Sequence, residues 1–244
     1  MPFSVTDSVD RYVADLEEER LPDGKWHPSS IASACERQSI YTMRGTEKSN
    51  PISTRTKRVF RVGHLMHEFV QAAIESDEDV TSFWPEVSIE SEALNITGHA
   101  DGLLMYADGS FEVLEFKTIK STAFRYGDLP KPDHIVQVSL YMKVLREHGA
   151  VLRDGSQTPP LGDRLKRGRI VYVSKDDLQI SEHTILWTAA KDKDIMDRLA
   201  RLNGHQADGT LPDRLPMKGA KRHYLCGYCS YEVTCWATSP KENA

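Results

Sequence analysis

One predicted β-hairpin constrains the fold of this 244-residue chain more than any other stretch of its sequence. Two runs of strand-forming residues, 96–106 and 110–118, flank Ala107-Asp108-Gly109, and an Asp-Gly pair between such runs is a strong signal for a hairpin turn. Because successive side chains of a strand point to opposite faces, Glu115 and Lys117 are expected to share one face of the second strand. The hairpin therefore places a carboxylate and an amine side by side.

Asp101 is expected to join this pair, because it lies near the start of the first strand and so faces the same end of the hairpin. An unpaired charge among apolar residues is strongly disfavoured, and a divalent cation removes that penalty for neighbouring carboxylates. Asp101 and Glu115 offer the hard oxygen ligands that Mg²⁺ or Mn²⁺ prefers, while Lys117 can orient or activate a water and offset phosphate charge. The alternative is a solvated hairpin with an incidental ion pair, which is the commoner explanation of Glu-x-Lys alone.

The order of these residues along the chain is Gly98-x-x-Asp101-Gly, a hairpin, and then Glu115-Phe-Lys117. This order resembles the core of the PD-(D/E)XK nuclease superfamily, specifically its RecB-like branch. The resemblance implies hydrolysis of phosphodiester bonds, with Asp101 and Glu115 holding the metal and Lys117 assisting the attacking water.

A long helix with an apolar stripe is predicted from Arg55 to about Ser76. His67 follows Gly63 by one turn on a neighbouring face, where the small Gly63 permits another element to approach closely. On its own, such a histidine is more often a partly buried core residue than a metal ligand. The surrounding Gly-His-Leu-Met-His-Glu resembles a RecB-like motif, which implies that His67 is the third ligand of the metal.

A second helix with residues of interest is predicted from Asp133 to about His148. His134, Gln137 and Tyr141 share one face of it, and Gln137 and Tyr141 are stacked one turn apart. A helix of ordinary sequence supplies such a pair by chance fairly often. Its position after the Glu-x-Lys strand resembles the RecB-like Gln-x-x-x-Tyr motif, which implies that the pair flanks the active site and contacts the nucleic-acid strand.

The cysteines form a separate constellation. Cys226, Cys229 and Cys235 form Cys-x2-Cys-x5-Cys, and Cys35, in a helix predicted at 31–43, is the possible fourth ligand. Four thiolates suit an iron–sulfur cluster or zinc, but structural zinc more often uses two Cys-x2-Cys pairs, so the spacing favours the cluster over zinc and over disulfides. The pattern is similar to that of the RecB-like nucleases with a 4Fe-4S cluster, including the CRISPR-associated exonucleases, and this implies a 4Fe-4S cluster bound by all four cysteines.

The net charge of −5 hides an uneven distribution. Residues 1–23 hold seven acidic residues and two arginines, so the rest of the chain carries about zero formal charge by difference. Residues 24–244 can still present basic patches to DNA, although their formal charges sum to about zero. Two basic clusters are candidate DNA contacts. One is Arg164, Lys166, Arg167 and Arg169, for which a role in solubility is the alternative, and the other is Lys221 and Arg222.

The sequence predicts a cytoplasmic protein. No apolar run approaches the roughly 20 residues of a membrane span, and the first residues lack a basic segment followed by an apolar one, so no membrane association is expected. Cysteines in a reducing compartment favour metal or redox roles over disulfides.

Beyond the hairpin, three more strands are predicted at 83–90, 169–173 and 179–186, and the first of them completes a three-stranded meander. An acidic surface helix is predicted at 6–20. Residues 121–132 are expected to be a loop, as are residues 149–168, which are rich in Gly, Pro and polar residues.

These elements predict an α/β fold, and the resemblance implies one nuclease domain over 1–244. The family resemblance implies a restriction-endonuclease-like core, a central mixed β-sheet flanked by helices, over residues 50–205. Residues 29–45 and 206–238, from the N- and C-terminal parts of the chain, are expected to form an iron–sulfur-bearing helical cap.

The resemblance predicts a Mg²⁺- or Mn²⁺-dependent DNA exonuclease acting on single strands or DNA ends in recombination, repair or CRISPR-type processing. It is expected to act alone, as a homo-oligomer or in a larger recombination or CRISPR complex. No Gly-x-x-x-x-Gly-Lys segment occurs, so no helicase motor is expected within this chain. Two alternatives stay open, a catalytically silent nucleic-acid-binding or assembly factor of the same fold and a zinc-stabilised endonuclease.

Overall fold

The computed structural model describes residues 3–16 and 22–237 of the chain. Within these ranges, five strands form one sheet in the order β1-β2-β3-β4-β5. The third and fourth strands run parallel, and the other neighbours are antiparallel, so the predicted mixed sheet is confirmed. The strands are β1 (Ser82–Ser91), β2 (Ile96–Met105), β3 (Phe111–Ile119), β4 (Leu165–Ser174) and β5 (Ile180–Leu186).

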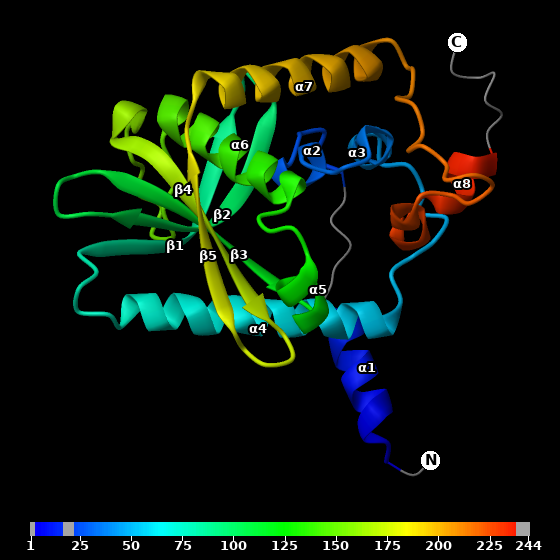
Figure 1. The fold of residues 1–244 in the computed structure, drawn as a ribbon, viewed down its shortest axis with the longest axis horizontal. Coiled ribbons are helices and arrows are strands. Elements are labelled where there is room, and N and C mark those ends of the chain that lie inside the picture. The colour runs from blue at the N-terminus through cyan, green and yellow to red at the C-terminus, as the bar shows by residue number, and fades with distance from the viewer. Residues whose placement is uncertain (1–2, 17–21, 238–244) are drawn as a thin grey trace.

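Helices cover both faces of this sheet (Figure 1). The helical elements are α1 (Val5–Leu16), α2 (Pro28–Ile31), α3 (Glu36–Met43), α4 (Thr54–Glu75), α5 (Ser121–Tyr126), α6 (Pro132–His148), η1 (Gly162–Arg164), α7 (Ala189–Ala207), η2 (Tyr224–Tyr228) and α8 (Glu232–Ala237). On one face, Val70 of α4 packs on Leu114 of β3. On the other face, Val138 of α6 joins the main core with Val113. No helix within the described ranges has the length and apolar character of a membrane span.

The predicted hairpin between β2 and β3 is confirmed. Gly109 in its turn has a φ of +78°, which glycine adopts without the penalty that other residues meet there. Asp108 Oδ1 accepts a hydrogen bond from the backbone N–H of Ser110 at 2.9 Å. The Asp-Gly pair therefore supplies both the backbone conformation and the side-chain contact that hold the turn.

Several boundaries differ from the prediction. The helix predicted at 31–43 begins only at Glu36 as α3, with Cys35 at its N-cap and the short α2 before it. The helix predicted at 6–20 is found as α1, and residues 17–20 lie outside the described residues. Part of the expected loop at 121–132 forms α5. The expected loop at 149–168 contains η1 and the start of β4, because the buried Leu165 pairs with Phe111 of β3. The polar Lys-Arg-Gly-Arg sequence that follows Leu165 concealed this strand.

The segments expected to form a cap meet beside the sheet (Figure 1). The backbone N–H of Asn50 donates to the carbonyl of Ser230 at 2.8 Å. The rings of Tyr41 and Tyr231 lie 5.3 Å apart between centroids, and Arg37 Nη1 donates to the carbonyl of Pro212 at 3.0 Å. The chain therefore returns to α3 after completing the sheet. Residue 238, the last of the predicted cap, lies outside the described residues.

Close packing between α6 and β4 depends on Gly168. A Cβ added there would lie 2.5 Å from Val138 Cγ1 and 2.9 Å from Val113 Cγ1, both shorter than real contacts of this kind. The helix therefore rests almost directly on the backbone of β4. This close approach sets the height of α6 above the sheet.

We expect Gly168→Ala to lower the free energy of unfolding by about 1–3 kcal/mol, because the added methyl group overpacks the contact between α6 and β4. Gly204→Ala on α7 is the matched control, since a Cβ there meets nothing within 4 Å, and alanine should favour the helix by roughly 0.8–1.0 kcal/mol. Urea denaturation of both variants measures the two effects. A Gly168→Ala protein as stable as the wild type would show that α6 can shift without penalty.

Candidate active site

The candidate site lies where β2 and β3 stop pairing. The last paired residues are Gly102 and Leu114, one position short of Asp101 and Glu115. There Asp101 Oδ2 accepts a hydrogen bond from the backbone N–H of Phe116 at 2.6 Å, so a side chain replaces the strand partner. The sheet opens at this point, and the opening is occupied by carboxylates.

Glu115 is almost completely buried, with 3% of its side chain exposed. Lys117 Nζ contacts Glu115 Oε1 at 2.6 Å, while Oε2 is buried and has no hydrogen-bond partner among the described residues. Burial, followed by the neighbouring charge of Asp101, raises the pKa of Glu115 to about 8. Burial opposes the charge of Lys117, but the Glu115 carboxylate outweighs it and raises the pKa of this lysine. The predicted pairing of Glu115 with Lys117 is thus found on one face of β3.

His67 projects from α4 toward the same opening. Its Nδ1 lies 3.5 Å from Asp101 Oδ1, and its ring stands edge-on to Phe116, with 5.8 Å between centroids. Burial opposes protonation of this imidazole, but Asp101 outweighs burial and raises the pKa of His67. A Cβ added at Gly63 would lie 3.3 Å from Thr118 Oγ1, so α4 comes close to β3 one turn before His67. The structure brings His67 to Asp101, and its role as a metal ligand stays a prediction.

Gln137 and Tyr141 lie on the buried side of α6, with 7% and 4% of each residue exposed. Gln137 Nε2 donates to the Tyr141 hydroxyl at 2.9 Å. Burial, reinforced by the charges of Glu115 and Asp101, raises the pKa of Tyr141 well above its ordinary value. The phenol therefore keeps its proton close to the two carboxylates, and the predicted contact with a nucleic-acid strand stays a prediction.

Sequence reasoning missed Gln71 and Glu86. Gln71 is buried on α4, and its Nε2 donates to Glu86 Oε1 at 2.9 Å and to the carbonyl of Asp101 at 2.8 Å. The available signal was its spacing, since Gly63, His67 and Gln71 follow one another at four-residue intervals on one helix face. Glu86, in β1, has a φ of +51°, and nothing in the sequence indicated this backbone conformation or the contact with Gln71.

The donor chemistry of this site fits a divalent cation. As the side chains lie, no group of three or more His, Cys, Asp or Glu residues in the described ranges is positioned to hold a metal ion. At this site, Glu115 Oε1 contacts Lys117 and Asp101 Oδ2 contacts a backbone amide. Glu115 Oε2 nevertheless remains buried without a partner beside a second carboxylate, and a hard cation is the ligand that offsets such a charge.

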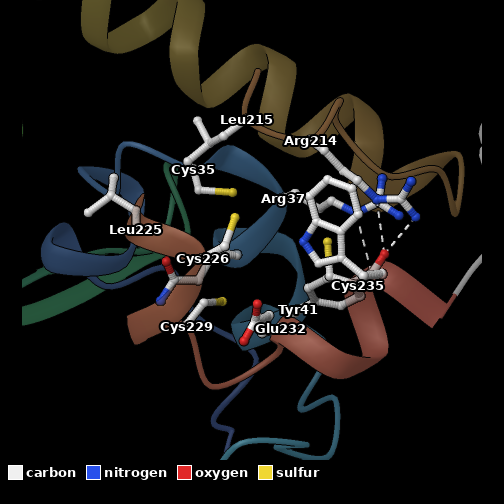
Figure 2. Close-up of a pocket in the computed structure, with 12 residues that line it drawn as sticks. Cys35, Arg37, Tyr41, Arg214, Leu215, Leu225, Cys226, Cys229, Glu232 and Cys235 are labelled. Atoms are coloured by element: carbon white, nitrogen blue, oxygen red, sulfur yellow. Dashed lines mark hydrogen bonds between the residues drawn. The ribbon is translucent and has the colours of Figure 1, made fainter. Parts of the chain in front are cut away.

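All four cysteines line one cavity beside α3 (Figure 2). Cys35 precedes α3, Cys226 and Cys229 belong to η2 and its C-cap, and Cys235 lies in α8. Burial, followed by the charges of Cys235 and Cys226, raises the pKa of Cys35, so the sulfurs lie within electrostatic reach of one another. The predicted convergence of Cys35 with the C-terminal triplet is found.

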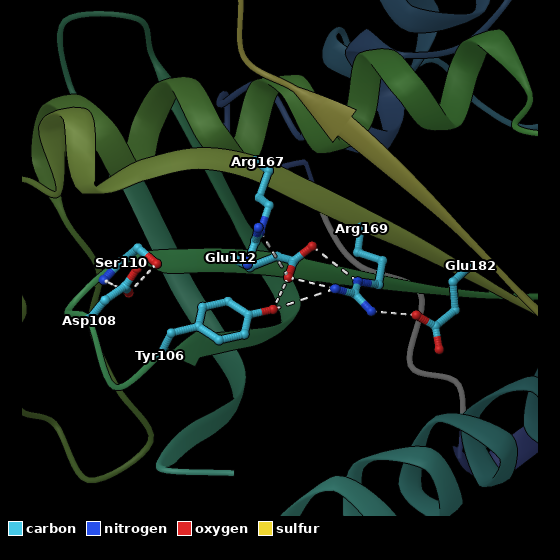
Figure 3. Close-up of polar contacts among 7 residues, drawn as sticks. All are labelled: Tyr106, Asp108, Ser110, Glu112, Arg167, Arg169 and Glu182. Atoms are coloured by element: carbon cyan, nitrogen blue, oxygen red, sulfur yellow. Dashed lines mark hydrogen bonds and ion pairs between the residues drawn. The ribbon is translucent and has the colours of Figure 1, made fainter. Parts of the chain in front are cut away.

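Arg167 and Arg169 of the basic cluster at 164–169 gather around Glu112 (Figure 3). Glu112, with none of its side chain exposed, accepts from Arg169 Nε at 3.0 Å and from Arg169 Nη2 at 2.9 Å. Arg169 also pairs with Glu182, and Arg167 Nε lies 3.4 Å from Glu112 Oε2. Because Glu112 alternates with Glu115 along β3, these arginines lie on the opposite face of the sheet. The charge that predicted DNA binding is therefore balanced within the protein at Arg167 and Arg169.

The remaining candidate DNA contacts lie in other surroundings. The Arg164 guanidinium lies over the ring of Phe111 at 5.2 Å, and Lys166 is exposed. Arg222 pairs with Glu232 at 2.9 Å and lies over Trp236, beside the cysteine cavity, while Lys221 is exposed. The structure does not bring these residues to Glu115, and their contact with DNA stays a prediction.

Comparison with known proteins bears on the family and the fold. A family sequence profile described as the PD-(D/E)XK nuclease superfamily matches residues 7–236. The crystal structure of SSO0001 is similar over 98% of both chains, with a TM-score of 0.56 and 16% identity, which shows a shared fold. The alkaline exonuclease LHK-Exo from Laribacter hongkongensis has a TM-score of 0.49 and 18% identity, covering 82% of this chain and 93% of its own. No curated protein matches the sequence.

The buried Glu115 predicts a pH signature in metal-free protein. Between the ordinary pKa of 4.5 and about 8, the folded protein holds a proton on Glu115 that the unfolded chain has released. The free energy of unfolding should therefore fall as pH rises through this window, by up to about 1.4 kcal/mol per pH unit. Denaturation in chelator, compared between wild type and Glu115→Gln, isolates the contribution of Glu115 to this pH dependence. The same pH dependence in both proteins would contradict it.

Proposed function

Because this chain belongs to the PD-(D/E)XK nuclease superfamily, we propose that it is a divalent-metal-dependent deoxyribonuclease that degrades single-stranded DNA or DNA ends. The observation that carries this proposal is the opening between β2 and β3, where Asp101 lies beside the buried Glu115 and Lys117. The exonuclease mode rests on the resemblance of the motif series to RecB-like exonucleases. DNA is the proposed partner, and the chain works alone, as a homo-oligomer or in a larger complex.

Asp101, Glu115 and His67 are the residues that would hold the metal. A divalent cation bound by this set supplies Lewis-acid stabilisation of the phosphate and lowers the pKa of water. The remaining chemistry belongs to the protein. Glu115 Oε1 holds the Lys117 ammonium in place, so that Lys117 can orient the attacking water and offset the charge that develops on the phosphate.

Neutral groups around the opening complete the proposed site. Gln71 ties the backbone of Asp101 to α4 and so restrains the carboxylate. Tyr141 keeps its proton because its pKa is raised well above the ordinary value, so its hydroxyl can donate to the strand. Gln137 orients that hydroxyl through its own N–H. These groups position the strand without adding a titrating charge.

We also propose that the cysteine cavity holds a 4Fe-4S cluster. Cys35 and the three C-terminal cysteines line one cavity, which supplies four thiolates to a single site. Zinc would require four sulfurs at about 2.3 Å from one centre, whereas a cluster distributes its ligands over several irons. The cluster would act as a crosslink between α3 and the C-terminal segment, since no group of the proposed nuclease site lies in that cavity.

Two other functions are compatible with the same fold. A catalytically silent DNA-binding or assembly factor would bind DNA without cleaving it, although it would have no need of the Lys117–Glu115 pair beside Asp101. A zinc-stabilised endonuclease would cleave circular single-stranded DNA, which an exonuclease leaves intact. End-labelled linear DNA and circular DNA, each incubated with Mg²⁺ or Mn²⁺, therefore separate the three.

We expect Lys117→Ala and Asp101→Asn each to reduce cleavage of end-labelled DNA by at least about 10²–10⁴-fold, since each removes a group at the scissile phosphate. DNA binding in chelator should be retained. Lys193→Ala, which removes an exposed lysine on α7, is the control and should cleave like the wild type. Full activity in Lys117→Ala would remove the hairpin from the chemistry.

For the cysteine cavity, anaerobically purified protein should be brown and contain about four irons per chain. Cys35→Ala should lose both colour and iron, and should be cleaved by protease more readily between 208 and 222, because cluster binding is coupled to folding. Absorption spectra, iron analysis and limited proteolysis measure these effects. A colourless protein with one tightly bound zinc would refute the cluster and leave the nuclease proposal standing.

A further inference from the structure

His134 is held firmly beside the proposed active site, and the mechanism above gives it no role. It lies in the first turn of α6 on the face that carries Gln137 and Tyr141, with 14% of its side chain exposed. Its Nδ1 lies 2.7 Å from the hydroxyl of Tyr172, which is completely buried. The two rings are 5.5 Å apart between centroids, so the orientation of the imidazole is fixed by a core residue.

The hydrogen bonds of Tyr172 determine which imidazole nitrogen carries the proton. The Tyr172 oxygen accepts the backbone N–H of Lys131 at 3.0 Å. Burial raises the pKa of Tyr172 to about 12, so the hydroxyl keeps its proton and needs an acceptor. Among the described residues that acceptor is His134 Nδ1. Burial and the charge of Lys117 lower the pKa of His134 to about 4, so the ring is neutral and its one proton resides on Nε2.

This Nε2–H has no hydrogen-bond acceptor among the described residues. Asp133 Oδ2 is 3.8 Å away, which is beyond hydrogen-bond distance. Lys117 and Lys131 both place positive charge near the ring, with Asp133 opposing them. An oriented N–H group beside two ammonium groups is suited to an anionic acceptor.

We propose, resting on the function proposed above, that His134 binds a backbone phosphate of the strand being cleaved, with Nε2–H as donor to a phosphate oxygen on the Lys117 side of the site. Because the ring is neutral, the contact adds direction without adding charge. Tyr172 acts as a positioning residue, since its hydroxyl selects the tautomer that makes Nε2 a donor.

Two substitutions separate this role from a structural one. His134→Asn keeps a polar atom at the position of Nδ1, beside Tyr172, and removes Nε2, whereas His134→Gln carries an N–H near the position of Nε2. We expect His134→Asn to weaken binding of an end-labelled single-stranded oligonucleotide by about tenfold, the loss of one hydrogen bond to a charged group. His134→Gln should stay within about threefold of the wild type.

Fluorescence anisotropy in chelator measures this binding without turnover. In cleavage assays with Mg²⁺, His134→Asn should raise KM more than His134→Gln does, and this rise should exceed any change in kcat. Thermal unfolding of both variants accompanies the measurement. Binding by His134→Asn equal to that of the wild type would overturn the inference, as would greater impairment in His134→Gln, which would assign His134 to the support of Tyr172. A wild-type protein that binds DNA but never cleaves it would overturn the proposed nuclease function while leaving the phosphate contact to stand on the binding data.

Discussion

The hydrogen bond from the Phe116 amide to the Asp101 carboxylate is the interaction on which the candidate site depends. It ends the pairing of β2 with β3 while giving the backbone N–H a partner, so the sheet can open without leaving a buried donor unsatisfied. A carboxylate as acceptor makes the bond stronger than an ordinary backbone pair. The opening brings Glu115 beside Asp101 and keeps both within reach of the two helices that cover the sheet.

Small residues set the distances at which those helices cover the opening. Gly63 lets α4 approach Thr118 of β3, and this approach brings His67 to Asp101. Gly168 lets α6 rest on β4, which brings Tyr141 within electrostatic reach of Glu115. Gly63 belongs to α4 itself, whereas Gly168 belongs to β4 and lies beneath α6. The positions of His67 and Tyr141 relative to the two carboxylates therefore depend on how closely each helix packs on the sheet, in addition to the polar contacts of the site.

The sequence predicted the elements whose pattern is local, and missed contacts that depend on strand register. Alternation along one strand was enough to pair Glu115 with Lys117. The ion pairs of Arg169 were not predicted, because the parallel register that sets Leu114 beside Arg169 follows from a long crossover and not from a turn. That register brings Glu112 to Arg169, and no spacing in the sequence indicates such a pair. Glu86 was missed for a similar reason, since its backbone conformation is imposed by tertiary contacts.

The cysteine cavity and the candidate active site are connected through the start of α4. The segment before this helix is fixed to the C-terminal part of the chain, where the Asn50 amide donates to Ser230 and its side chain donates to the carbonyl of Cys229 at 3.3 Å. Ser53 then caps α4 by accepting the N–H of Thr56. His67 is carried by this same helix, so order around the cysteines restrains the position of His67 without any contact between them. A cofactor that crosslinks the cap would thus influence the candidate active site through folding and helix placement.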